Sequence, residues 1–137
     1  MGSNEKFKAL IVEDHSAQRK SIRELLLGLF PFMVVMEAKD GRGALLSVNA
    51  EIPNLIFMDI KLPDGNGLEL TRLIKKEHPE TSIVIITNHN LPEYREAALE
   101  CGGDLFIPKD SMNSETVRYL VEEVLSGKGL DLRKYGG

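Results

Sequence analysis

Side chains able to bind or accept an anionic group stand just after four short apolar segments of this sequence. They comprise three carboxylates, one hydroxyl and one amine: Glu13, Asp14, Asp59, Thr87 and Lys109. A carboxylate acts as a nucleophile or as a ligand of a hard cation, an amine supplies a point charge, and a hydroxyl donates a hydrogen bond. Each side chain alone is ordinary, but their joint placement predicts a site that accepts an anion on a carboxylate.

Bringing the three carboxylates together has an electrostatic cost. Two of them about 4 Å apart repel by roughly 4 kcal/mol at an effective dielectric near 20. A hard divalent cation removes this repulsion, and Mg2+ keeps water ligands that phosphoryl oxygens can replace. We expect Glu13 and Asp14 to bind the metal and Asp59, on the middle segment, to act as the nucleophile. Lys109 would add a charge and Thr87 a hydroxyl donor.

Five short apolar runs predict the strands that position these side chains. They occupy residues 9–12, 33–36, 55–58, 83–86 and 105–107. The first, third and fourth runs do not alternate with polar residues, as expected of strands covered on both faces. Apolar residues at helical spacing lie between the runs, and they form a weaker stripe of small residues at 94–101. This alternation predicts an α/β fold with a parallel sheet, in which ligands bind at the carboxyl ends of the strands.

Length and composition predict one cytoplasmic domain. The 137 residues fit one domain at 1–126 and a glycine-rich tail, or the start of a linker, at 127–137. The net charge of -4 predicts no direct binding of nucleic acid, and no apolar run has the length of a signal peptide or a membrane span. The single cysteine, Cys101, excludes an internal disulfide and is interpreted as a small buried hydrophobe.

Several of these residues also have simpler explanations. Asp14 or Ser16 could cap the following helix, and Pro63-Asp64-Gly65 is ordinary turn chemistry. Phe106 fits core packing, and His15 is interpreted as a solvated side chain without a partner. A turn does not, however, require an aspartate at the end of a buried strand, which keeps Asp59 as the candidate nucleophile.

Over residues 7–126 the chain resembles the receiver domains of two-component response regulators. The resemblance rests on the acidic pair, Asp59, Thr87 and Lys109, on the run Asp59-Ile60-Lys61-Leu62-Pro63-Asp64-Gly65, and on Gly102-Gly103. It implies a doubly wound, flavodoxin-like (βα)5 fold with strand order 2-1-3-4-5. It also implies Mg2+ at Glu13, Asp14, Asp59 and the backbone carbonyl of Lys61. Asp59 would take a phosphoryl group from the phosphohistidine of a sensor histidine kinase or phosphotransfer protein.

The same resemblance implies a switch and a set of tuning residues. Thr87 would move toward the phosphoryl group and leave room for Phe106, three residues before Lys109, to turn inward. Asn88 stands where a smaller residue is usual, so it would narrow access to Asp59 or bond to the phosphoryl group. Lys61 and His89 flank the site and would influence how fast water removes that group.

The resemblance has further implications for partners. Lys109-Asp110-Ser111 is similar to the ending of receivers joined to helix-turn-helix domains. This leaves two alternatives: a C-terminal DNA-binding domain outside these residues, or a stand-alone regulator. A phosphorylation-dependent homodimer is a further implication. The chain would act as a signalling receiver that catalyses only its own phosphorylation and slow autodephosphorylation.

Three alternatives compete with this interpretation. A haloacid-dehalogenase-type phosphatase would carry D-x-D after the first strand, whereas here Lys61 follows Asp59 at that spacing on the third. A flavodoxin-like FMN carrier would place hydroxyls and glycine where Glu13-Asp14 would repel a phosphate. The remaining alternative is a phosphorylation-independent interaction module of the same fold, which would be expected to have a damaged site.

Overall fold

The computed structural model of the chain describes residues 6–88 and 92–127. The strands are β1 Lys8–Val12, β2 Val34–Ala38, β3 Leu55–Asp59, β4 Lys61–Leu62, β5 Gly65–Asn66, β6 Ser82–Thr87 and β7 Leu105–Pro108. The helices are α1 Ser16–Leu29, α2 Gly41–Ala50, α3 Gly67–Glu77, α4 Pro92–Glu100 and α5 Ser114–Gly127, and a 3-10 turn covers Lys109–Ser111. Strands and helices therefore alternate along the chain, as the apolar runs predict.

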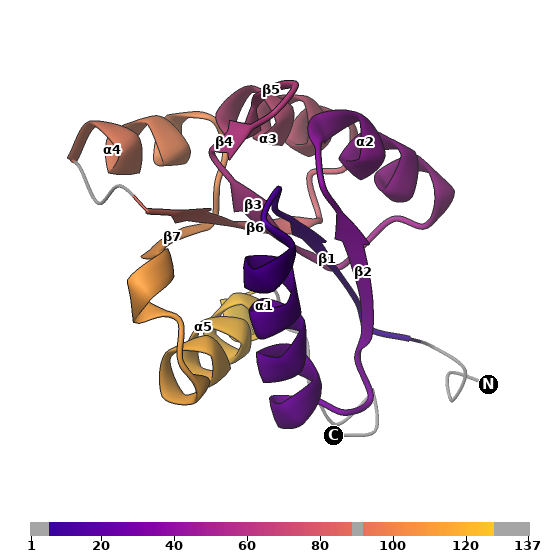
Figure 1. The fold of residues 1–137 in the computed structure, drawn as a ribbon. Coiled ribbons are helices and arrows are strands. Elements are labelled where there is room, and N and C mark those ends of the chain that lie inside the picture. Colours follow the sequence, from indigo (N-terminus) through magenta and orange to yellow (C-terminus); the bar gives the residue numbers. More distant parts are fainter. Residues whose placement is uncertain (1–5, 89–91, 128–137) are drawn as a thin grey trace.

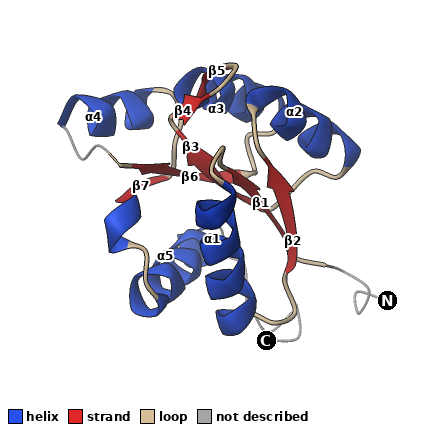
Figure 2. Ribbon diagram, viewed as in Figure 1, coloured by secondary structure: helices blue, strands red, loops and turns tan. Residues whose placement is uncertain are grey.

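Five strands form one parallel sheet in the order β2-β1-β3-β6-β7. Helices α2, α3 and α4 cover one face of this sheet, and α1 and α5 cover the other (Figures 1 and 2). Because β6 and β7 are the fourth and fifth strands of the sheet, the order equals the predicted 2-1-3-4-5. The doubly wound, flavodoxin-like α/β fold is confirmed. The short strands β4 and β5 pair antiparallel in a separate hairpin that was predicted only as a turn.

Two hydrophobic clusters hold the helices to the sheet. All five residues of β3 are buried, and alternate side chains point to opposite faces. Phe57 packs with the residues of α1 and α5, whereas Met58 packs with those of α2 and α3. Burial on both faces explains why the apolar runs of the inner strands do not alternate with polar residues. The site residues thus extend from strands that are fixed from both sides.

The elements differ from expectation mainly at their ends. The second strand runs from Val34 to Ala38, beginning one residue after the apolar run and ending two residues beyond it. Helix α4 buries only Ala98, in agreement with its weak stripe, and Cys101 is buried just after the helix. Helix α5 includes Gly127, and the rest of the predicted tail lies outside the described residues. Among the described helices, none combines the length and the apolarity that crossing a membrane requires.

Candidate functional site

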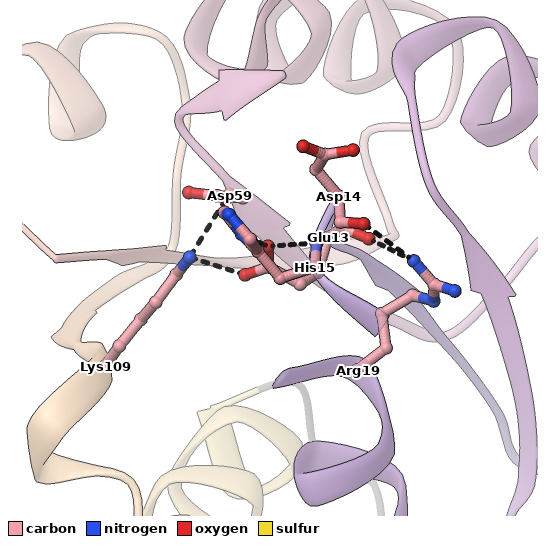
Figure 3. A network of polar contacts seen from close by, with 6 residues as sticks. All are labelled: Glu13, Asp14, His15, Arg19, Asp59 and Lys109. Carbon is pink, nitrogen blue, oxygen red and sulfur yellow. Dashed lines mark hydrogen bonds and ion pairs between the residues drawn. The ribbon is translucent and has the colours of Figure 1, made fainter. Parts of the chain in front are cut away.

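Three strand ends bring Glu13, Asp59 and Lys109 into contact. Glu13 follows β1, Asp59 ends β3 and Lys109 follows β7, and all three are buried. The Lys109 ammonium donates to Asp59 Oδ2 at 3.0 Å and lies 2.5 Å from Glu13 Oε1 (Figure 3). One cation thus serves two carboxylates, as the placement of these residues after parallel strands leads us to expect.

The sharing of one ammonium by two carboxylates shifts their proton affinities in opposite directions. Burial raises the pKa of Asp59, and the charge of Glu13 raises it further, so Lys109 offsets these effects only in part. Burial also opposes ionisation of Glu13, but hydrogen bonds from Lys109 and His15 outweigh it and lower the pKa of Glu13. Burial disfavours charge on Lys109, yet both carboxylates together raise its pKa. Of the three groups, only Asp59 is therefore harder to ionise in the folded protein than in water.

His15 holds the second oxygen of Glu13, which corrects the expectation that this histidine has no partner. Its backbone N–H donates to Glu13 Oε2 at 3.0 Å, and its Nδ1 lies 3.1 Å from the same oxygen. The imidazole is 71% exposed, so it covers the outer side of the carboxylate rather than entering the core. The backbone N–H of Glu13 in turn donates to the Ala38 carbonyl at 3.0 Å, which ties the loop to β2.

Asp14 does not join the other two carboxylates. Its side chain is exposed and points away from Lys109 in Figure 3. It does not cap α1 either, because His15 occupies the N-cap position and makes no side-chain capping bond. Only the Asp14 carbonyl is engaged, by the guanidinium of Arg19 at 3.1 Å. Within the described part of the chain, no three side chains of metal-ligating type are gathered.

Helix α3 begins directly against the end of β3, and its first residue, Gly67, must be glycine. A Cβ on Gly67 would lie 1.8 Å from the Asp59 carbonyl oxygen, which no side chain tolerates. The N–H of Gly67 donates to the Ile60 carbonyl at 2.7 Å, and the Asn66 side chain caps α3 by accepting from Leu68 at 2.7 Å. The end of β3 and the start of α3 thus leave no space for a side chain between them.

Asp64, predicted only as a turn residue, bonds to a second helix. Its two carboxylate oxygens accept from the backbone N–H groups of Gly41 at 2.8 Å and Arg42 at 3.0 Å, at the N-terminus of α2. These bonds hold the pKa of Asp64 below its ordinary value. The N-terminus of a helix is a favourable place for a carboxylate, because the first N–H groups of the helix lack partners within it. The β4–β5 hairpin that carries Lys61 is thereby fastened to α2.

The remaining predicted residues surround this centre at different depths. Thr87 is buried at the end of β6, whereas Asn88 and Lys61 are exposed. Phe106 on β7 is half-buried against the cluster under α2, α3 and α4. The guanidinium of Arg95 on α4 lies 5.0 Å from the centre of the Phe106 ring, a cation–π contact absent from our sequence interpretation. His89 lies outside the described residues.

The donor set fits a hard divalent cation. Glu13 Oε1 is buried and receives no hydrogen bond of acceptable geometry among the described residues, despite its contact with Lys109. The two facing carboxylates carry one more negative charge than Lys109 neutralises, and their oxygens are the ligand type that Mg2+ selects.

The contacts of Arg19 with the carbonyls of Glu13 and Asp14 were not predicted. The sequence holds one signal for them, because a cation in the first turn of a helix opposes the helix dipole.

The sequence matches the family model of the response regulator receiver domain over residues 9–121. Among curated relatives, the transcriptional regulatory protein YdfI of Bacillus subtilis is 30% identical over 123 residues, covering 90% of this chain and 57% of that protein. The transcriptional activator DevR/DosR of Mycobacterium tuberculosis is 33% identical, covering 90% of this chain and 56% of that protein. The chain thus spans just over half the length of these relatives.

Solved structures share the fold. A CheY-like response regulator receiver domain from Methanospirillum hungatei superposes with a TM-score of 0.83 at 28% identity, covering 91% of this chain and 98% of the other. The BeF3-activated DrrB receiver domain superposes with a TM-score of 0.79 at 27% identity, covering 89% and 99%.

Proposed function

This chain belongs to the response regulator receiver domains of two-component systems, and we propose that Asp59 is its phosphate-accepting residue. The observation that carries the proposal is the buried contact of Lys109 with both Asp59 and Glu13 at the carboxyl edge of the sheet. In open parallel sheets ligands bind at this edge. A buried aspartate with a raised pKa, beside a fixed cation, is an arrangement suited to chemistry rather than to stability.

The proposed reaction transfers a phosphoryl group to Asp59. An Asp59 carboxylate oxygen attacks the phosphorus of a phosphohistidine, forming the P–O bond of an acyl phosphate. The P–N bond breaks, and its electron pair returns to the imidazole, which takes up a proton. Burial of Asp59 keeps water away and favours attack by the carboxylate. The reaction depends mainly on positioning and on neutralising charge at the phosphoryl oxygens.

The other residues of the site would neutralise and orient the phosphoryl group. Lys109 would turn from its two carboxylates toward a phosphoryl oxygen, and Thr87 would donate its hydroxyl to another. Glu13, Asp14, Asp59 and the carbonyl of Lys61 would hold Mg2+. When bound, this ion would supply positive charge to the phosphoryl oxygens. The two buried carboxylates Glu13 and Asp59, which share the single charge of Lys109, support this assignment.

The signal would leave the site through Thr87 and α4. Phosphorylation adds roughly 1.5 to 2 negative charges, and the movement of Thr87 toward them would change the surroundings of Phe106. Helix α4 is the element best suited to respond, because only Ala98 anchors it by full burial. We further propose that Asn88, Lys61 and His89 set the lifetime of the phosphoryl group.

The wider setting of the domain follows from its relatives. Because the curated relatives are named as transcriptional regulators and are longer, we propose that 1–126 is a receiver, followed by a linker and a DNA-binding domain in the whole protein. The domain would act in the cytoplasm, and its partners would be a sensor histidine kinase or phosphotransfer protein and, after phosphorylation, a second copy of the receiver. Its own catalysis would be limited to phosphorylation and slow autodephosphorylation.

Intact-mass measurement after treatment with phosphoramidate or acetyl phosphate tests this function. The native chain with Mg2+ should gain one phosphoryl group, and the gain should disappear when Mg2+ is chelated. Asp59→Asn should gain none, whereas Asp110→Asn, which removes an equal charge from an exposed position, should behave as the native chain. A folded native chain that gains no phosphoryl group with Mg2+ present would instead support the phosphorylation-independent interaction module.

A further inference from the structure

Arg19 of α1 reaches back over the loop that carries Glu13 and Asp14 (Figure 3). Its Nη1 donates to the carbonyl oxygen of Glu13 at 2.9 Å and to that of Asp14 at 3.1 Å. Its Nε donates to Glu37 Oε1 at 3.1 Å. The side chain is only 19% exposed, so these bonds are partly shielded from water. One guanidinium therefore joins two consecutive loop carbonyls to β2.

Glu37 is itself held from a second side. Arg23, one turn further along α1, donates from Nη1 to Glu37 Oε2 at 3.3 Å and to the Val35 carbonyl at 3.1 Å. Both oxygens of the Glu37 carboxylate are thus engaged by guanidinium groups. Because the guanidinium is planar and its donors have fixed directions, this arrangement fixes the orientation of Arg19 as well as its position.

Helix stability does not account for Arg19. A cation in the first turn opposes the helix dipole, and the N-cap residue His15 makes no side-chain capping bond to offset this effect. The bonds of Arg19 go instead to the backbone from which both acidic side chains project. That backbone would otherwise present two carbonyls to water beside the site.

We infer that Arg19 is a positioning residue for the metal site, fixing the Glu13–Asp14 backbone so that Glu13 stays in the site and only the Asp14 side chain must turn to reach the cation. This inference rests on the proposed function, because it takes Glu13 and Asp14 as ligands. Arg19 contacts neither Asp59 nor Lys109 in Figure 3, so it acts through the loop alone. Groups that orient metal ligands from behind generally change metal affinity by about 10- to 100-fold when removed.

The positive charge of Arg19 and its hold on the loop should have opposite effects on Mg2+ affinity, and this difference makes the inference testable. A positive charge near the site repels Mg2+, so if charge alone mattered, removal of Arg19 would strengthen binding. If Arg19 positions the loop, its removal should weaken binding. Lysine in its place keeps the charge but lacks the fork of donors that reaches both carbonyls and Glu37. Arg19→Lys should therefore bind Mg2+ nearly as weakly as Arg19→Ala.

The experiment is a calorimetric Mg2+ titration of the native chain, Arg19→Ala, Arg19→Lys and Arg23→Ala. Arg23 is the matched control, because it also pairs with Glu37 but bonds to the Val35 carbonyl instead of the acidic loop. We expect about 10- to 100-fold weaker binding for both Arg19 variants and a change below about two-fold for Arg23→Ala. Backbone amide NMR spectra without metal should show shifts at Asp14 and His15 in the Arg19 variants while the sheet signals stay in place.

The outcomes separate this inference from the proposed function. If the native chain binds no Mg2+, the proposed metal site itself is wrong. If the native chain binds Mg2+ and Arg19→Ala binds equally or more tightly, the metal site stands and the role of Arg19 is refuted. If Arg19→Ala loses its fold, Arg19→Lys decides the question, and native affinity in that variant overturns the inference.

Discussion

Asp59→Asn should make the metal-free protein more stable, because the Asp59 carboxylate is ionised in the fold at a cost in free energy. The two oxygens that contact Lys109 Nζ lie 2.5 Å and 3.0 Å from it, which places them within about 6 Å of each other. At an effective dielectric near 20, repulsion from Glu13 is then about 3 kcal/mol and attraction to Lys109 about 5 kcal/mol. Desolvation of a buried ion costs several kcal/mol more.

The direction of the Asp59 pKa decides the sign of this sum. Because its pKa is raised, folding disfavours the charged carboxylate relative to the unfolded chain. Repulsion and desolvation together outweigh the attraction to Lys109, so we expect the uncharged asparagine to stabilise the fold by about 1 kcal/mol or more. For a domain of this size, each kcal/mol corresponds to a rise of roughly 3–5 °C in Tm.

The assay is urea and thermal unfolding with a chelator, repeated over a range of pH. A raised carboxyl pKa means that native stability falls as pH rises from the unfolded value near 3.9 through the folded pKa. The advantage of Asp59→Asn should therefore be complete at neutral pH and vanish below about pH 4. Asp14→Asn is the matched control, since it removes the same charge from an exposed side chain and should change metal-free stability little.

Mg2+ should reverse the order of the two proteins. Saturation at about 100 times the dissociation constant stabilises a binding protein by about 2.7 kcal/mol, and Asp59→Asn should gain much less of this. Equal or lower stability of Asp59→Asn without metal would refute the electrostatic argument. A gain that persists unchanged at low pH would show that its cause is packing rather than charge.

Three further changes test other parts of the structure. Gly67→Ala should destabilise the fold by more than about 3 kcal/mol, since its Cβ would meet the Asp59 carbonyl, and urea unfolding measures this. Asp64→Ala should lower stability because two N–H groups at the start of α2 lose their acceptor, and Asp64→Asn should be less destabilised in the same assay because its amide oxygen can still accept one of these bonds. Arg95→Ala should loosen the contact of α4 with Phe106 and raise the hydrogen exchange of α4 amides, and unchanged exchange would contradict a restraining role.

The sheet could be predicted from the sequence because both faces of its inner strands are buried. Runs without polar alternation mark such strands, and topology then places the residues after them at one edge. This reasoning anticipated the meeting of Asp59 with Glu13 and Lys109. It depends only on strand order, which side-chain conformations do not alter.

The unpredicted contacts all depend on side-chain direction. Asp14 was expected beside Glu13, but adjacent residues in a loop need not point the same way, and its carboxylate faces solvent. His15 bonds back to Glu13, and Asp64 reaches α2 across 23 residues of sequence. Arg19 spans from α1 to β2. No periodicity records such bonds, since each depends on the direction in which one polar side chain points.

The contact between Gly67 and Asp59 also supplies a fixed point from which motion can be measured. Because a Cβ on Gly67 would already meet the Asp59 carbonyl, α3 begins in direct contact with β3, and we expect it to keep its position on that strand. A spectroscopic probe on the exposed Lys76 of α3 would stay in place, whereas one on the exposed Glu96 of α4 would follow a helix anchored by a single buried alanine. The distance between the two probes would report displacement of α4 directly, without reference to any partner protein.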